Sequence, residues 1–258
     1  MIQGVVPEGS TPPPHPLPPH PALTAYYAGA AERVGFVRRL FDVTAGDYDG
    51  INQIFSFGTA RRHRARMLRE IGLGPGKMVL DVATGTGMLA AAALPLVGPS
   101  GSVTALDLSA GMLRVAGRHP GLRLVQGPME ALPFANAQFE LLTMGYALRH
   151  AASLDGAFAE FARVLRPGGQ VLLLEIGRPG SRLAHLLAGA YLGRVVPLLS
   201  RLAGSGRHAE TLMRYYWDTI ETCVSPETIL TALLAAGFQN ARCTTEFGLL
   251  KTYRATRP

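Results

Sequence analysis

Two acidic residues and two glycines are spaced as in a binding site for a ligand that carries a ribose. Asp81 ends a short apolar run that begins at Met78, and Gly85 and Gly87 follow directly before a stretch that favours a helix. Asp107 ends a second apolar run roughly twenty residues after Gly87, where an acidic side chain accepts hydrogen bonds from both ribose hydroxyls. We therefore expect a ligand crevice at the carboxyl ends of two parallel strands.

Two ligands fit this spacing, a dinucleotide and S-adenosylmethionine, and the residues favour the second. Ala90 stands three residues after Gly87, which the broader dinucleotide pattern G-x-G-x-x-G/A allows. Asp81, however, would repel a pyrophosphate, whereas it suits the ammonium and sulfonium groups of S-adenosylmethionine. We predict S-adenosyl-L-methionine as the cofactor, and no metal.

Apolar runs and helix-forming stretches alternate along the chain. Strands are expected at 78–80, 103–106, 122–126, 139–146, 171–175, 241–247 and 249–254. Helices are expected at 88–96, 110–118, 154–165 and 226–236. Pro167-Gly168-Gly169 is expected to end the third of these helices, and Gly248 to join the last two strands as a hairpin. This order predicts an α/β, Rossmann-like fold with a seven-stranded, mostly parallel sheet, an antiparallel C-terminal strand and helices on both faces.

Composition divides the chain into three parts. Residues 1–22 are rich in proline and predict a disordered arm, in which His15 and His20 belong to a solvated tail. Residues 23–71 predict a helical cap, and residues 72–258 the ligand-binding domain. An insertion at 181–215 is apolar but punctuated by basic residues, so it could lie over the crevice, on a membrane surface or in the core.

The charge balance and the cysteines bound the compartment and the partners. The formal net charge is +7 among 258 residues, which fits an anionic membrane surface, nucleic acid or acidic substrates. No aromatic residues alternate with the arginines of 61–69, so nucleic acid is not expected. Two cysteines and no secretory or membrane-spanning segment indicate the cytoplasm, with peripheral contact at the inner membrane face and a homodimer left open.

Several segments together resemble the class I S-adenosylmethionine-dependent methyltransferases, and among them the UbiE/COQ5 family of quinone-biosynthesis C-methyltransferases. The matching segments are F-D-V-T-A-G-D-Y-D-G-I-N with S-F-G, L-D-V-A-T-G-T-G, A-L-D with S-A-G-M-L, E-A-L-P-F, A-L-R-H, R-V-L-R-P-G-G, L-L-E-I-G-R-P and A-A-G-F. They cover nearly everything from Phe41 to Tyr253. The Y-D-x-x-N block and A-L-R-H are the most particular to this family.

The resemblance implies roles for individual residues. The implied cofactor-binding residues are Asp81, Ala83, Thr84, Gly85, Gly87, Asp107, Leu108, Met112, Met129, Glu130 and Gly145. The implied substrate-pocket residues are Asn52, His63, Tyr146, Tyr215 and Tyr216. The candidate catalytic residues are Arg149 and Tyr48, which the resemblance implies, and His150, which is a hypothesis for this chain. In this scheme Arg149 stabilises a phenolate and holds a water. His150 is either the base, as an imidazole that titrates near neutrality, or only a hydrogen-bonding residue.

The chain departs from the family pattern at several positions. Thr84 stands where the family usually has a second glycine, and Pro128 where it has an aspartate that would accept from the adenine amino group. Adenine recognition would then depend on the Met129 backbone and on apolar contacts. His63 stands in place of a tryptophan and His150 in place of an asparagine. Residues 214–218 also differ, so most departures fall on the acceptor side.

Three functions are therefore compared. C-methylation of a phenolic or quinol ring, either a prenylated quinone precursor or a related aromatic, needs alignment, desolvation and a base for the ring proton. N-methylation of a membrane lipid headgroup would use the same fold. A non-catalytic cofactor-binding partner protein is the third, and the intact set of Asp81, Gly85, Gly87 and Asp107 argues against it.

Overall fold

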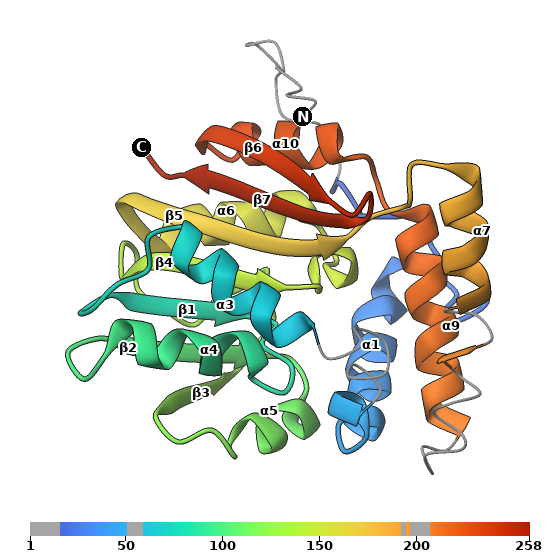
Figure 1. Ribbon diagram of the computed structural model, residues 1–258, viewed down its shortest axis with the longest axis horizontal. Coiled ribbons are helices and arrows are strands. Elements are labelled where there is room, and N and C mark those ends of the chain that lie inside the picture. The colour runs from blue at the N-terminus through green and yellow to red at the C-terminus, as the bar shows by residue number, and fades with distance from the viewer. Residues whose placement is uncertain (1–15, 51–58, 192–194, 197–206) are drawn as a thin grey trace.

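Seven strands form one mixed sheet in the order β3-β2-β1-β4-β5-β7-β6, with helices on both faces (Figure 1). The computed structural model describes residues 16–50, 59–191, 195–196 and 207–258. The strands are β1 (Met78–Val82), β2 (Ser102–Asp107), β3 (Leu122–Gln126), β4 (Phe139–Gly145), β5 (Leu165–Ile176), β6 (Gln239–Glu246) and β7 (Leu250–Thr256). The helices are α1 (Ala30–Thr44), α3 (Ala60–Glu70), α4 (Met88–Val97), α5 (Ala110–Ala116), η1 (Leu148–His150), α6 (Leu154–Val164), α7 (Arg182–Ala190), α9 (Arg207–Thr222) and α10 (Pro226–Ala235).

The sheet confirms the predicted fold class. Strands β1 to β5 are paired in parallel, whereas β7 runs antiparallel to both β5 and β6. β2 lies on one side of β1 and β4 on the other, so the strand order reverses between β1 and β4. Open α/β sheets bind ligands at such a point, beyond the carboxyl ends of the strands.

Successive strand residues enter two separate cores, because side chains alternate across a sheet. Leu80 and Leu142 pack with Phe158 of α6 on one face. Val79 packs with Met67 of α3 on the other face. Parallel strands that are buried on both faces have continuous apolar sequences, so these strands could be predicted from the sequence.

A third group of helices lies beside the carboxyl ends of the strands, where α1, α7 and α9 stand together in Figure 1. Val37 and Leu40 of α1 and Leu212 and Tyr215 of α9 share one buried cluster with Ile176 of β5. No residue of α7 is buried. Among the described residues, no helix is both long enough and apolar enough to cross a membrane.

The end of the proline-rich segment differs from the predicted solvated tail. The backbone N–H of Leu17 donates to Asp155 Oδ2 at 2.9 Å, and the N–H of Val224 donates to the carbonyl of Pro19 at 2.8 Å. His20 is only 1% exposed. The prediction of a solvated tail was therefore wrong for Leu17, Pro19 and His20, because proline-rich composition favours an extended chain but does not prevent parts of that chain from packing.

The Pro167-Gly168-Gly169 turn also differs from its expected place. Helix α6 ends at Val164, and Leu165 already has extended backbone angles, so the turn lies within β5 instead of ending the helix. The N–H of Gly168 donates to the carbonyl of Arg257, and the N–H of Arg257 donates to the carbonyl of Gly169. Pairing with the last residues of the chain therefore draws this segment into the sheet.

Some predictions fall outside the described residues. These are residues 1–15 of the predicted arm, Asn52, the Ser56-Phe57-Gly58 segment, and most of 192–206 within the predicted insertion.

Candidate active site

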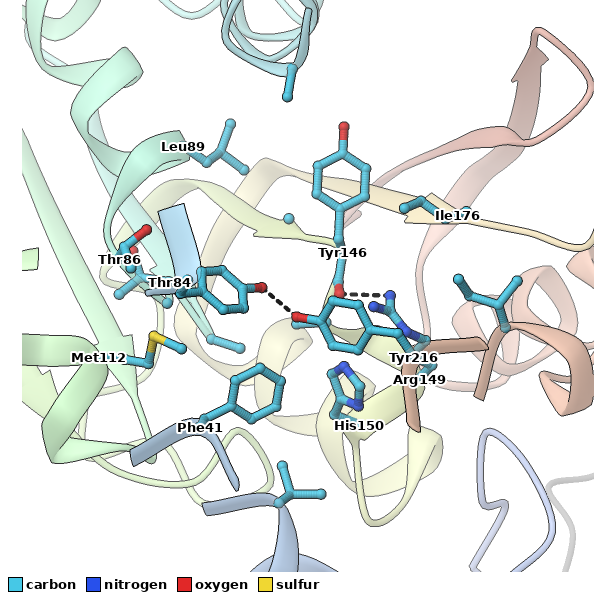
Figure 2. A pocket seen from close by; sticks show the side chains of 18 of the residues that line it. Phe41, Thr84, Thr86, Leu89, Met112, Tyr146, Arg149, His150, Ile176 and Tyr216 are labelled. Carbon is cyan, nitrogen blue, oxygen red and sulfur yellow. Dashed lines mark hydrogen bonds between the residues drawn. The ribbon is translucent and has the colours of Figure 1, made fainter. Parts of the chain in front are cut away.

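A cavity of about 690 Å³ opens at the carboxyl ends of the central strands. It is lined by every predicted site residue in the described part of the chain except Gly87 and Tyr215. Figure 2 shows its centre, where aromatic side chains and the Arg149 guanidinium lie on one side and the threonines of the glycine loop on the other. The sheet topology thus brings the predicted cofactor residues and acceptor residues into one continuous space.

Asp107 is fixed by backbone groups at the end of β2. Its Oδ2 accepts from the N–H of Gly85 at 2.8 Å, and its Oδ1 accepts from the N–H of Ser109 at 2.8 Å. Burial raises the pKa of Asp107 to about 6, although these amides oppose the shift. Each oxygen keeps a further lone pair, so the carboxylate can still accept from two hydroxyls of a ligand.

Asp81 occupies the equivalent place at the end of β1. Its Oδ2 accepts from the Thr84 hydroxyl and its Oδ1 from the Thr143 hydroxyl, both at 2.6 Å. Burial raises the pKa of Asp81 to about 6. Thr84, which departs from the family pattern, therefore serves to orient this carboxylate toward the cavity.

Two residues beside the cavity adopt backbone angles that side chains rarely take. Ala83 has a φ of 52° and Tyr146 a φ of 62°, and they follow β1 and β4 on the two sides of the switch point. The N–H of Tyr146 donates to the carbonyl of Leu174 at 2.7 Å, which holds the turn in place. Strained backbone that is held in this way is typical of ligand sites.

Two aspartates near α1 tie the glycine loop to the helical part of the chain. Asp49 Oδ1 accepts from the Thr86 hydroxyl at 2.6 Å. Asp42 Oδ1 accepts from the Ser109 hydroxyl at 2.6 Å and from the N–H of Gly111 at 2.9 Å. Sequence reasoning missed both aspartates as site-building residues, although they lie in the F-D-V-T-A-G-D-Y-D segment.

Arg149 is held by a partner that the sequence analysis did not single out. Glu175, near the end of β5, forms a buried ion pair with Arg149, whose exposed fraction is 1%. Arg149 Nη1 also donates to the carbonyl of Tyr146 at 2.7 Å, and its guanidinium carbon lies 4.8 Å from the centre of the Tyr216 ring. Within the described part of the chain, the Arg149 Nε atom has no hydrogen-bond partner. Much of the positive charge of Arg149 is therefore balanced by Glu175.

His150 is a buried, neutral imidazole. Its ring centre lies 5.5 Å from that of Tyr215 and 5.3 Å from that of Phe41. Burial, followed by the charges of Arg149 and Arg33, lowers the pKa of His150 well below 6.5, so the expectation that it titrates near neutrality was wrong. Neither ring nitrogen has a hydrogen-bond partner among the described residues. Because unpaired buried nitrogens are costly, the ring is suited to meet a polar group of a ligand.

Tyrosines surround this end of the cavity. The hydroxyls of Tyr48 and Tyr216 are hydrogen-bonded to each other, as the dashed line in Figure 2 marks. The Tyr146 hydroxyl lies 3.1 Å from His63 Nδ1. The Arg64 guanidinium lies over the Tyr146 ring at 5.4 Å.

Two predicted residues serve the site from behind it. Gly87 precedes α4 with a φ of 82°, and a Cβ there would lie 3.1 Å from that of Ala116, so its glycine is needed for packing. Tyr215 does not wall the cavity but lies behind His150, edge-on to Tyr26 at 5.3 Å. Gly87 was predicted from the spacing of the glycine loop and Tyr215 from family position, and neither signal distinguishes a residue that lines the cavity from one that packs behind it.

The residues present fit S-adenosylmethionine better than a dinucleotide. Gly85 has a φ of 58°, and a Cβ built there would meet nothing within 4 Å, so open space lies against the loop. The carboxylates of Asp49, Asp81 and Asp107 surround that loop, and they would repel a pyrophosphate while they attract a cationic amino acid group. The apolar side chains of Leu108 and Met112 complete this end of the cavity.

Comparisons with known proteins agree with this arrangement. A model of the ubiE/COQ5 methyltransferase family matches residues 28–256. A ubiquinone/menaquinone biosynthesis C-methyltransferase from Edwardsiella ictaluri is 34% identical over 218 residues, which cover 82% of this chain and 86% of the relative. One from Hahella chejuensis is 32% identical over 213 residues, which cover 80% and 84%.

Solved structures share the fold at lower identity. A methyltransferase from Aquifex aeolicus has a TM-score of 0.58 and 16% identity, covering 81% of this chain and 98% of that one. A possible histamine N-methyltransferase from Thermotoga maritima has a TM-score of 0.62 and 16% identity, covering 86% and 99%. With the family match and the relatives, the conclusion is that the chain belongs to the ubiE/COQ5 methyltransferase family and is an S-adenosylmethionine-dependent methyltransferase.

Proposed function

We propose that the enzyme methylates a ring carbon of a quinol or related hydroxylated aromatic. The observation that carries this proposal is the two-ended cavity, with Asp81 and Asp107 at one end and the tyrosines, Arg149 and His150 at the other. The printed names of the relatives, C-methyltransferases of ubiquinone and menaquinone biosynthesis, support it.

The cofactor end needs only residues that the cavity already presents. Asp107 would accept from the ribose hydroxyls and Asp81 from the amino acid ammonium, while Leu108, Met112 and Met129 would contact the adenine. When bound, S-adenosylmethionine supplies an electrophilic methyl group on a sulfonium. The chain contributes alignment and exclusion of water, which suffice for an in-line displacement by a reactive carbon.

The acceptor end must favour an ionised ring hydroxyl and then remove a proton. As the hydroxyl loses its proton to solvent water, the neighbouring ring carbon becomes nucleophilic, and Arg149 would stabilise the negative oxygen. The carbon–methyl bond forms as the sulfur–methyl bond breaks, which leaves a hydrogen on the methylated carbon. His150 would take this proton, and because its loss restores an aromatic ring, a weakly basic imidazole is sufficient.

The cavity continues from the reaction centre into an apolar region that would suit a hydrocarbon tail. Its walls there include Ile176, Leu187, Trp217, Leu249 and Leu250. An aromatic head with a long apolar substituent would fill both parts. This extension favours a prenylated quinol over a small phenol.

We further propose that the α7 face contacts an anionic bilayer. Leu183 and Leu186 are 67% and 68% exposed, and Phe247, at the β6–β7 turn, is 85% exposed and lines the cavity. Arg178 and Arg182 are exposed at the beginning of this face. Apolar residues flanked by basic ones suit the surface of a membrane with anionic lipids.

Sedimentation with phosphatidylglycerol–phosphatidylcholine vesicles tests the membrane contact. Replacing Leu183 and Leu186 by serine should reduce the bound fraction several-fold, whereas Leu234→Ser on α10, where Leu234 is 38% exposed, should not. Binding should weaken with salt, because it includes arginine–lipid attraction. Unchanged binding in the leucine variant contradicts the proposal, and a change in the mass of the protein in solution would assign the face to a dimer instead.

Incubation with methyl-labelled S-adenosylmethionine and a lipid extract tests the function. We expect the label in a neutral, hydrophobic product that absorbs as a quinone after oxidation in air. Label in a phospholipid headgroup would instead support the N-methyltransferase alternative. Transfer to neither, with the cofactor bound, would support the non-catalytic alternative.

A further inference from the structure

A second buried arginine lies behind the catalytic turn η1. Arg33 of α1 is 3% exposed, and its Nη2 donates to the carbonyl oxygen of Arg149 at 2.8 Å. The same Nη2 lies 2.6 Å from Nε2 of His20, which comes from the segment that precedes α1. Arg33 does not line the cavity, so it acts on the site through the residues of η1.

The partner of Arg33 is a neutral histidine. His20 Nδ1 lies 2.7 Å from the carbonyl of Pro21, which can only accept, so Nδ1 carries the hydrogen and Nε2 accepts from Arg33. Burial, then the charge of Arg33, lowers the pKa of His20 to about 4. His20 therefore orients the guanidinium without neutralising its charge.

The charges of the side chains around η1 do not cancel. Arg149 is paired with Glu175, whereas no carboxylate of the described residues lies within ion-pair distance of Arg33. The charge of Arg33 also acts to lower the pKa of three other groups, those of His150 on η1, Tyr215 on α9 and Cys223 after α9. His150 and His20 are neutral, so one positive charge remains buried behind η1.

A buried charge without a partner costs stability. Such charges are found at functional sites, where they can stabilise a bound group of opposite sign. The adjacent cavity is lined by Arg149 and His150, and its acceptor end is where a ring hydroxyl would ionise. Arg149 alone would stabilise a negative oxygen there less than an unpaired arginine would, because Glu175 neutralises much of its charge.

We propose that Arg33, held by the neutral His20, is a positioning residue whose uncompensated charge favours the ionised form of the acceptor's ring hydroxyl. This inference rests on the proposed quinol-type acceptor. The charge acts through the backbone of η1, and the segment at 16–22 contributes to the site by supplying a neutral hydrogen-bond acceptor in place of a carboxylate.

Two substitutions of His20 separate charge from packing. His20→Gln keeps a neutral acceptor for Arg33, whereas His20→Glu keeps the hydrogen bond but adds a carboxylate that neutralises Arg33. The probe is 4-nitrocatechol, whose ionisation is followed by its visible absorption while it is bound to the enzyme. A second pair keeps the test independent of whether His20→Glu folds, namely Arg33→Met and the exposed control Arg38→Met on the same helix.

In the wild type, His20→Gln and Arg38→Met, the bound probe should ionise at the same pH. In His20→Glu and Arg33→Met its pKa should rise by about one unit, and the pH–rate rise with a quinol acceptor should move upward equally. Coincident probe titrations for His20→Glu and His20→Gln overturn the inference, since a purely structural role would not distinguish them. A wild type that neither binds the probe nor methylates a quinol overturns the proposed acceptor as well, so the two failures are distinct.

Discussion

At the residue scale, the Asp107 carboxylate accepts hydrogen bonds from two backbone amides and also lines the cavity. Asp107→Ala should weaken the binding of S-adenosylmethionine about 10- to 100-fold, because ribose hydroxyls would be left without an acceptor at a cost of about 1–3 kcal/mol. Titration calorimetry measures this. An unchanged dissociation constant would show that Asp107 only shapes the loop.

The Arg149–Glu175 pair allows catalysis to be separated from folding. Arg149→Met leaves the Glu175 carboxylate buried without its partner, so we expect a loss of about 3–5 kcal/mol in the free energy of unfolding. Adding Glu175→Met should restore most of that stability. The double variant should still turn over at least about a hundredfold more slowly than the wild type, as for other lost oxyanion donors. Recovery of activity together with stability would contradict the assigned role of Arg149.

The buried His150 should make the free energy of unfolding decrease as the pH falls. The unfolded chain protonates His150 below about pH 6.5, whereas the folded chain does so only at much lower pH, so stability is lost as the pH falls below 6.5. Asparagine does not titrate. His150→Asn should therefore gain stability relative to the wild type between pH 7 and pH 5, by at most about 1.4 kcal/mol per pH unit. Denaturant unfolding at both values checks this, and a constant difference would mean that His150 is protonated normally in the fold.

The site residues could be predicted from the sequence only where local spacing or family position identifies them. Asp81 and Asp107 follow from strand ends and a glycine loop. Glu175 could also have been predicted, since it too stands near the end of a strand. Arg33 and His20 could not be predicted from the sequence, because their importance arises from contacts around η1. Arg33 and Arg149, for example, are 116 residues apart in the chain.

At the scale of elements, composition identified the parallel strands well and the first segment poorly. Buried parallel strands are apolar throughout, so β1 and β2 were located to within a few residues. Segment 16–22 is mostly proline, and it is held by backbone hydrogen bonds, by Leu17 against the core and by His20. Such contacts leave no periodic pattern in a sequence.

Truncation tests the role of this segment. Removing residues 1–22 should lower the melting temperature by several degrees and reduce turnover, because Arg33, Asp155 and the N–H of Val224 lose their partners. A variant that begins at residue 16 is the matched comparison, since it keeps every one of these contacts. Equal melting temperatures and rates for the two truncations would show that the segment contributes nothing.

At the scale of the whole molecule, the sheet and the helices beside it build one reaction space from distant parts of the chain. The strand ends supply Asp81 and Asp107, while α1, η1 and α9 bring Phe41, His150 and Tyr216 around the acceptor end (Figure 2). The cofactor end could be predicted because it follows from the order of strands. The residues of the acceptor end could be named from family position, but their arrangement required the structure, because the helices that carry them are placed by packing.

The position of the transferred methyl group tests the central claim most directly. The enzyme is incubated with a reduced quinol that has a free ring carbon beside a hydroxyl, together with S-adenosylmethionine carrying a ¹³C-labelled methyl group. The product is then examined by mass spectrometry and carbon NMR. We predict one added label whose carbon shift is that of a methyl bonded to an aromatic carbon. A label bonded to oxygen, or a quinol that stays unlabelled while wild-type enzyme binds the cofactor, would contradict C-methylation of a quinol ring.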